Sequence, residues 1–118
     1  MTVALVVCIK RRSGLSGQEF ARYWREVHAP LIRDCGGFNR HLVSYTQYHL
    51  VEQDSPVARM FGVSGDYDGI AVLEFRSVTE MQQAFAEPAY LEHARPDEPN
   101  FVDLEHGLCF ITEPNKVI

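Results

Sequence analysis

The sequence has little positive charge and no hydrophobic run long enough to cross a membrane. Its 11 Lys and Arg residues are outnumbered by 16 Asp and Glu among 118 residues, which gives a formal net charge of −5. Nucleic-acid-binding domains usually carry a basic surface, and the one basic cluster, Lys10, Arg11 and Arg12, we interpret as a solvated loop. No apolar run approaches the roughly 20 residues of a membrane-spanning helix. We therefore expect neither nucleic acid nor membrane as a partner.

Cysteine is also scarce, and its spacing argues against a metal site. Cys8, Cys35 and Cys109 are far apart and form no Cys-x-x-Cys or Cys/His cluster. We expect Cys8 and Cys109, which fall in apolar strand patterns, to be buried small side chains. His93 and His106 each neighbour a single glutamate, which is too few ligands for a metal. Glycine-rich phosphate loops and nucleophile elbows are missing as well, so no cofactor is expected.

Four segments have the pattern of β-strands. Residues 3–10 are a short, β-branched apolar run typical of a central strand. Residues 69–75 and 108–112 are predicted as two further strands. Residues 38–51 alternate and predict a long strand, but both of its faces mix aromatic and polar side chains, so the core-facing side stays open. Residues 52–68 form a long connection, of a length that is often functional or mobile.

Two segments have the pattern of capped helices. The capping box Ser16–Glu19 predicts a first helix that runs to about Cys35, and Ser77–Glu80 repeats that pattern ahead of a second helix. One apolar stripe follows the first helix: Phe20, Trp24, Val27 and Leu31.

The order of these elements predicts one α+β domain over residues 1–118. The order β-α-β, β-α-β is that of a ferredoxin-like βαββαβ fold, in which a four-stranded antiparallel sheet carries helices on one face. The other face stays apolar, and a second copy of the chain is its simplest cover, so we predict a homodimer. An N-terminus that begins directly on a strand pattern favours a cytoplasmic protein.

His28 is the first candidate for chemistry. It borders the apolar stripe on one side, and Tyr23 borders it on the other. Pro30 cannot donate a backbone hydrogen bond to Glu26, so the helix should kink just past His28. A neutral imidazole beside such a gap suits general acid–base catalysis near neutral pH. Alternatively, His28 only bridges locally, to Asp68 or a backbone carbonyl, and positions the kink.

Further candidates come from the strand pattern and the long connection. His41, Tyr45 and His49 share one strand face. His41 or Tyr45 would form a proton-transfer pair with His28 if that face meets the first helix, and would be an interface residue if it meets a partner copy. Asp68 is a candidate to fix the tautomer of His28, or is a plain turn residue.

The wall of a pocket is predicted from the aromatic residues near His28. Tyr67, in the long connection, is placed to close over a ligand. Most of the other candidates are equally typical of an ordinary core, because pocket walls and cores use the same residue types. The candidates for binding a small hydrophobic molecule are Phe20, Tyr23, Trp24, Val27, Tyr67 and Phe85.

Three segments resemble the EthD-domain family. FARYWREVHAPLIRD, residues 20–34, is similar to the family's first-helix signature. DYDGIAVLEFRSVTEMQQAF, residues 66–85, resembles its second segment, and PDEPNFVD, residues 96–103, its late acidic segment. The resemblance implies that two ferredoxin-like domains pair into a dimeric α+β barrel.

The same resemblance implies a range of functions. The first is a cofactor-independent lyase or isomerase (a cyclase, dehydratase, decarboxylase or lactone isomerase) that uses a histidine as general acid/base on a small aromatic or polyketide-like substrate. The second is a non-catalytic ligand-binding or accessory protein of a degradation or biosynthetic cluster, as the family's namesake is. The third is a cofactor-free or haem-dependent monooxygenase.

Overall fold

The computed structural model describes residues 1–62 and 66–118, and an antiparallel four-stranded sheet is its central element. The strand order β2-β3-β1-β4 is that of the predicted ferredoxin-like fold. The strands are β1 (Val3–Ile9), β2 (Leu42–His49), β3 (Gly69–Phe75) and β4 (Leu108–Thr112). The runs 69–75 and 108–112 therefore form strands with the predicted bounds.

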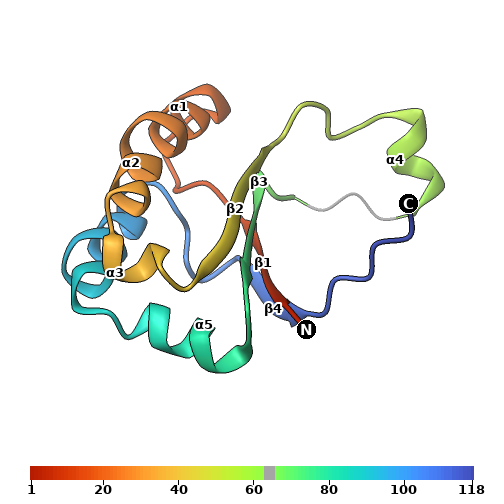
Figure 1. Ribbon diagram of the computed structural model, residues 1–118. Coiled ribbons are helices and arrows are strands. Elements are labelled where there is room, and N and C mark those ends of the chain that lie inside the picture. The colour runs from red at the N-terminus through yellow and green to blue at the C-terminus, as the bar shows by residue number, and fades with distance from the viewer. Residues whose placement is uncertain (63–65) are drawn as a thin grey trace.

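Helices connect the strands and lie mainly on one face of the sheet. Figure 1 shows α1, α2, α3 and α5 on one side, with α4 and the C-terminus on the other. The α-helices are α1 (Gly17–Tyr23), α2 (Ala29–Arg33), α3 (Gly36–Asn39), α4 (Pro56–Met60) and α5 (Val78–Phe85). Two π-helices, η1 (Trp24–His28) and η2 (Tyr90–Ala94), and a 3₁₀-helix, η3 (Arg95–Asn100), complete the described chain.

The predicted helix starts are confirmed. The Ser16 hydroxyl accepts from the Glu19 amide at 3.1 Å, and the Glu19 carboxylate accepts from the Ser16 amide at 3.0 Å, which completes the capping box. At α5 the Ser77 hydroxyl accepts from the Glu80 amide. Here the box is only half made, because the Glu80 carboxylate binds Arg76 instead.

The predicted start of the long second strand is wrong. Gly36–Asn39 forms the short helix α3, and β2 begins only at Leu42. The alternation of polar and apolar residues did not indicate this short helix. The helix places Phe38 in the core with no exposed surface. In the predicted long connection, residues 52–68, the described part contains α4, and residues 63–65 lie outside the described residues.

A bulge in β2 decides which of its residues face the helices. Leu42 lies opposite Phe75 and Ser44 lies opposite Glu74, so one extra residue sits between them. Strict alternation would put Leu42 and Tyr45 on opposite faces, yet both pack against the core. The face of Tyr45 thus meets the helices, which answers the question that the sequence left open.

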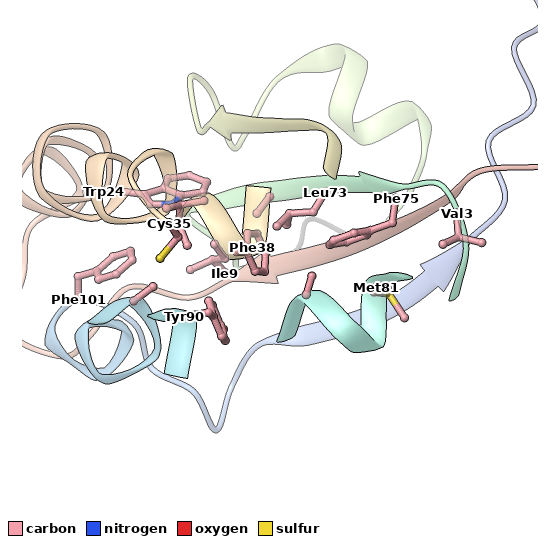
Figure 2. Packing of buried hydrophobic residues seen from close by; sticks show 14 of the residues in the cluster. Val3, Ile9, Trp24, Cys35, Phe38, Leu73, Phe75, Met81, Tyr90 and Phe101 are labelled. Carbon is pink, nitrogen blue, oxygen red and sulfur yellow. The ribbon is translucent and has the colours of Figure 1, made fainter. Parts of the chain in front are cut away.

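The core fills the space between the sheet and the helices. Its side chains come from both layers (Figure 2). The largest fully buried side chains are Phe20, Trp24, Phe38, Phe75 and Phe101. Of the cysteines, Cys35 is buried, while Cys8 is only half-buried and Cys109 is exposed. The burial expected for Cys109 is wrong because β4 is an edge strand whose residues are largely open.

Candidate functional site

A π-turn ahead of Pro30 turns His28 into the molecule. The Ala29 amide donates to the Trp24 carbonyl, five residues back. Pro30 has no amide hydrogen for the carbonyl of Glu26, and a wider turn accommodates that gap. Because the π-turn holds one extra residue, the buried face of the helix continues from Trp24 to His28, four residues on, and not to Val27. His28 is therefore 6% exposed, whereas Val27 is 44% exposed. The predicted place of Val27 on the buried stripe is therefore wrong.

The second π-turn repeats this arrangement before another proline. The Arg95 amide donates to the Tyr90 carbonyl, one residue ahead of Pro96. The chain then tightens into η3, which carries the adjacent acids Asp97 and Glu98. One π-turn thus positions His28, and the other lies just ahead of the helix that carries Asp97 and Glu98. Such turns occur frequently at functional sites.

Asp97 joins the two helical segments. Its Oδ2 accepts from His28 Nδ1 at 3.0 Å, and its Oδ1 accepts from the Tyr23 hydroxyl at 2.5 Å and from Asn100 Nδ2 at 3.0 Å. Burial by itself raises the pKa of Asp97, but the hydrogen bonds from Tyr23, Asn100 and His28 outweigh burial and hold the pKa below its ordinary value. Asp97 is therefore an ionised carboxylate at neutral pH.

This carboxylate fixes the orientation of the His28 ring. An ionised carboxylate only accepts hydrogen bonds, so the proton must sit on Nδ1 of His28. The ring also packs on Phe101, with centroids 4.8 Å apart. Within residues 1–62 and 66–118 no side chain or backbone group is hydrogen-bonded to Nε2. Nε2 therefore carries no proton and is the ring nitrogen left to accept a hydrogen bond.

His28 lines a cavity of about 350 Å³ between the helices and the sheet. Most of the wall is apolar, and Figure 2 shows Trp24, Phe101 and Tyr90 around the end of β1 marked by Ile9. The polar and charged side chains in the wall are His28, Tyr45, Tyr90, Arg95, Glu98 and Asp103. A few placed polar groups on an apolar wall are typical of small-molecule sites.

Tyr45 is a second polar residue of the cavity wall. Its phenolic oxygen accepts from Gln47 Nε2 at 3.3 Å, which leaves the phenolic proton free to be donated. Burial raises the pKa of Tyr45, so the phenol is a neutral donor at neutral pH.

The other predicted ligand-binding residues divide between the wall and its support. Trp24 and Phe85 line the cavity. Phe20 lies behind the wall and packs at a tilt on Trp24, with ring centroids 5.6 Å apart. Tyr23 donates a hydrogen bond to Asp97 instead. Tyr67 is half-buried and does not line the cavity.

Asp68 does not reach His28. Its carboxylate accepts from the Arg11 amide and the Arg11 guanidinium, both at 2.8 Å. The tautomer-fixing role predicted for Asp68 belongs by geometry to Asp97, 69 residues along the chain from His28. The sequence reasoning missed Asp97, whose only signal was its place in the late acidic segment.

His41 and His49 also lie apart from the cavity. His41 is buried between Glu80 and Glu87, with a nitrogen-to-oxygen distance of 3.4 Å to each. His49 packs at a tilt on Trp24 with ring centroids 4.6 Å apart. Burial, aided by the charge of Arg25, lowers the pKa of His49. The structure therefore brings Tyr45, and not His41, to the same cavity as His28.

The part of the chain that the structure describes has neither a metal-ligand cluster nor a membrane-spanning helix. No group of three or more His, Cys, Asp or Glu side chains there is arranged to hold a metal ion. No helix in that part has the length and apolar character needed to cross a bilayer.

Known proteins are similar to this chain in sequence and in fold. The sequence model of one protein family, the EthD domain, matches residues 12–105, which is most of the chain. The chain belongs to the EthD-domain family. Dehydratase aurZ of Gibberella zeae is 28% identical over 114 residues, covering 89% of this chain and 72% of that protein. The conidial pigment biosynthesis dehydratase EthD of Metarhizium robertsii is 26% identical over 115 residues, covering 92% and 80%.

Solved structures agree on the fold. An EthD-family protein from Bacillus halodurans superposes with a TM-score of 0.70 at 18% identity, over 98% of this chain and 100% of that one. A protein from Bacteroides fragilis, described as dimeric with a ferredoxin-like fold, has a TM-score of 0.61 at 12% identity over 96% of each chain. At these identities the likeness concerns the fold alone.

Proposed function

We propose that this EthD-domain protein is a cofactor-independent lyase of the dehydratase type, acting on a small aromatic or polyketide-like molecule. The observation that carries the proposal is the Asp97–His28 pair at the wall of a largely apolar cavity. The two dehydratase-named relatives support this reaction class. A lyase of this kind needs a base and an acid, and His28 and Tyr45 in the cavity wall are the side chains that we assign to these roles.

The proposed reaction is loss of water from a β-hydroxyketone. His28 Nε2 takes a proton from the carbon next to the carbonyl, and the electron pair of that C–H bond forms the new C=C bond as the hydroxyl leaves. The imidazolium returns the proton to the departing hydroxide, so that water is released and His28 is neutral again. Asp97 stabilises the imidazolium meanwhile, and the Tyr45 hydroxyl donates to the carbonyl oxygen as charge develops there.

The test uses 3-hydroxy-1-tetralone, which loses water to give 1-naphthol. We expect the protein to accelerate formation of 1-naphthol, followed by fluorescence, above the background rate. His28→Gln should lower the rate about 100-fold, the low end of general acid–base contributions, and Tyr45→Phe should lower it by a smaller factor. His93→Gln, at an exposed histidine, is the matched control and should leave the rate unchanged.

Other outcomes separate the remaining candidates. If His28→Gln turns over as fast as the wild type, the general-base proposal is wrong. Binding of 1-naphthol without any acceleration would favour the non-catalytic ligand-binding protein. Consumption of oxygen during incubation, with or without added haem, would favour the monooxygenase.

We also propose that a second copy of the chain covers the open face of the sheet. On that face Val6 is paired with Phe110 and Cys8 with Leu108, and both β4 residues are about half exposed. Ile70 and Tyr48 continue the apolar row across β3 and β2. A contiguous apolar patch of this kind marks an interaction surface, and the Bacteroides protein of the same fold is described as dimeric.

Light scattering after size exclusion tests the dimer. The wild type should elute with the mass of two chains, and Phe110→Glu should elute as one chain because a buried unpaired charge disrupts an apolar interface. Val27→Glu, an exposed site on the helical side, should remain a dimer. A wild-type mass of one chain at micromolar concentration would refute the proposal.

A further inference from the structure

We propose that the cavity contains a second polar site, formed by Glu98 with Tyr90 and Arg95, that binds a hydroxyl group of a neutral aromatic ligand and rejects carboxylic acids. This inference rests on the proposed function in one respect, because the same cavity must hold the ligand. It adds a selection rule that the Asp97–His28 pair does not supply.

The site is built from a carboxylate held on both oxygens. The Tyr90 hydroxyl donates to Oε2 of Glu98 at 2.8 Å, and Nη1 of Arg95 donates to Oε1 at 2.7 Å. Tyr90 is 5% exposed and the Glu98 side chain 17% exposed, while the Arg95 side chain is 57% exposed. All three line the cavity, so Glu98 sits between a buried phenol and a solvated guanidinium.

Glu98 keeps spare capacity as a hydrogen-bond acceptor. A carboxylate has about four lone-pair sites, and the two bonds described use one on each oxygen. In an apolar cavity the remaining sites favour a ligand that brings its own donor, because hydrogen bonds to charged groups are worth about 1.5–3 kcal/mol. A phenolic or alcoholic hydroxyl is such a donor and carries no charge to desolvate.

The charges of the wall disfavour anions. Arg95 contributes one positive charge, and Glu98 and Asp103 contribute two negative ones, so the wall carries a net charge of −1. The guanidinium of Arg95 is already paired with Glu98. A ligand carboxylate would therefore lose its hydration beside like charge, without a free cation to replace it.

The side chains of Asp97 and Glu98 point to different parts of the site because they are neighbours in a 3₁₀-helix. Neighbouring residues of a 3₁₀-helix point about 120° apart, since the helix has three residues per turn. Asp97 turns to His28 of η1, and Glu98 turns to Tyr90 of η2. Glu98 and Tyr45 line the same cavity. Burial raises the pKa of Tyr45, hydrogen bonds from Gln47 and Trp24 lower it, and the charge of Glu98 raises it further.

Calorimetry with three matched probes tests the inference. At neutral pH 1-naphthol should bind about tenfold more tightly than naphthalene, the equivalent of about 1.4 kcal/mol, and 1-naphthoate should bind more weakly than naphthalene. Glu98→Gln keeps the shape of the side chain and removes its charge. In that variant we expect the preference for 1-naphthol to shrink and 1-naphthoate to bind at least as well as naphthalene.

The controls keep the inference separate from loss of folding and from the proposed function. Glu92→Gln removes the same charge from an exposed position of η2 and should retain the wild-type selectivity. Naphthalene affinity and melting temperature report whether the cavity of Glu98→Gln is intact. Wild-type binding of 1-naphthoate as tight as that of 1-naphthol, unchanged selectivity in Glu98→Gln, or no binding of any probe would each overturn the inference.

The two proposals fail differently. Selectivity for 1-naphthol without dehydration of 3-hydroxy-1-tetralone would leave the hydroxyl site standing and overturn the lyase. Dehydration without that selectivity would do the reverse.

Discussion

Replacing Asp97 by Asn should move the proton of the His28 ring from one nitrogen to the other. Tyr23 and Asn100 both donate to Oδ1, so the single oxygen of an asparagine is best used there. The new amide NH₂ then faces Nδ1 of His28, which must become an acceptor and carry its proton on Nε2. The nitrogen that faces a bound molecule would thus change from a base to a donor.

The cost in stability follows from the same contacts. Hydrogen bonds to a charged acceptor contribute about 1.5–3 kcal/mol and neutral ones about 0.5–1.5 kcal/mol. Two donors that lose a charged acceptor should therefore lower the free energy of unfolding by about 2 kcal/mol, since each bond weakens by about 1 kcal/mol. For a domain of this size that is a fall in melting temperature of about 8 °C.

The sign of the pH dependence is also determined. Because the folded state holds the pKa of Asp97 below its ordinary value, the carboxylate stabilises the fold above the unfolded-state pKa of about 3.9 and loses this effect as the pH falls through the folded-state pKa. The stability difference between wild type and Asp97→Asn should therefore shrink below about pH 4.

Long-range proton–nitrogen NMR of the imidazole side chains measures the tautomer directly. The His28 signals are assigned by their absence in His28→Gln. The wild type should carry the proton on Nδ1 and Asp97→Asn on Nε2, with dehydration of 3-hydroxy-1-tetralone reduced about 100-fold. The same tautomer in both proteins, or a stability difference that does not change with pH, would refute the reasoning.

Three further predictions concern packing and buried phenols. Gly69→Ala would place a Cβ 2.5 Å from Trp24 Cζ3 and 2.9 Å from the Tyr48 carbonyl, so we expect about 1–3 kcal/mol of destabilisation and a shifted Trp24 emission; an unchanged melting temperature would contradict this. Phe38→Ala empties a side chain with no exposed surface and should cost about 3–5 kcal/mol in urea unfolding, a value that a loss below about 1 kcal/mol would refute. Burial first, and then Glu98, raise the pKa of Tyr90, so above about pH 10 the unfolded phenol ionises while the folded one does not. Wild-type stability should therefore fall there more steeply than that of Tyr90→Phe, and equal slopes would count against the assignment.

Sequence-based reasoning succeeded where the signal lies within one or two turns of chain. The capping box at Ser16 and the strand bounds at 69–75 and 108–112 depend on neighbouring residues, and the order of the elements then restricts the topology to a few choices. It failed where one inserted residue changes the phase. The π-turn before Pro30 moved His28 into the place predicted for Val27. The sequence had left open which face of the second strand meets the helices, and the structure, with its bulge after Leu42, shows that the face of Tyr45 does.

By itself the sequence determined the fold class, the two helix starts and the choice of His28 as the residue of interest. Only the tertiary structure decided which residue His28 is paired with, because its partner Asp97 is 69 residues away and no local pattern links the two. The same holds for Glu98, whose contact with Tyr90 depends on how η2 and η3 fold back over the sheet. Caps and strands are set by local hydrogen bonding and side-chain pattern, whereas a site is set by distances that exist only once the core has packed.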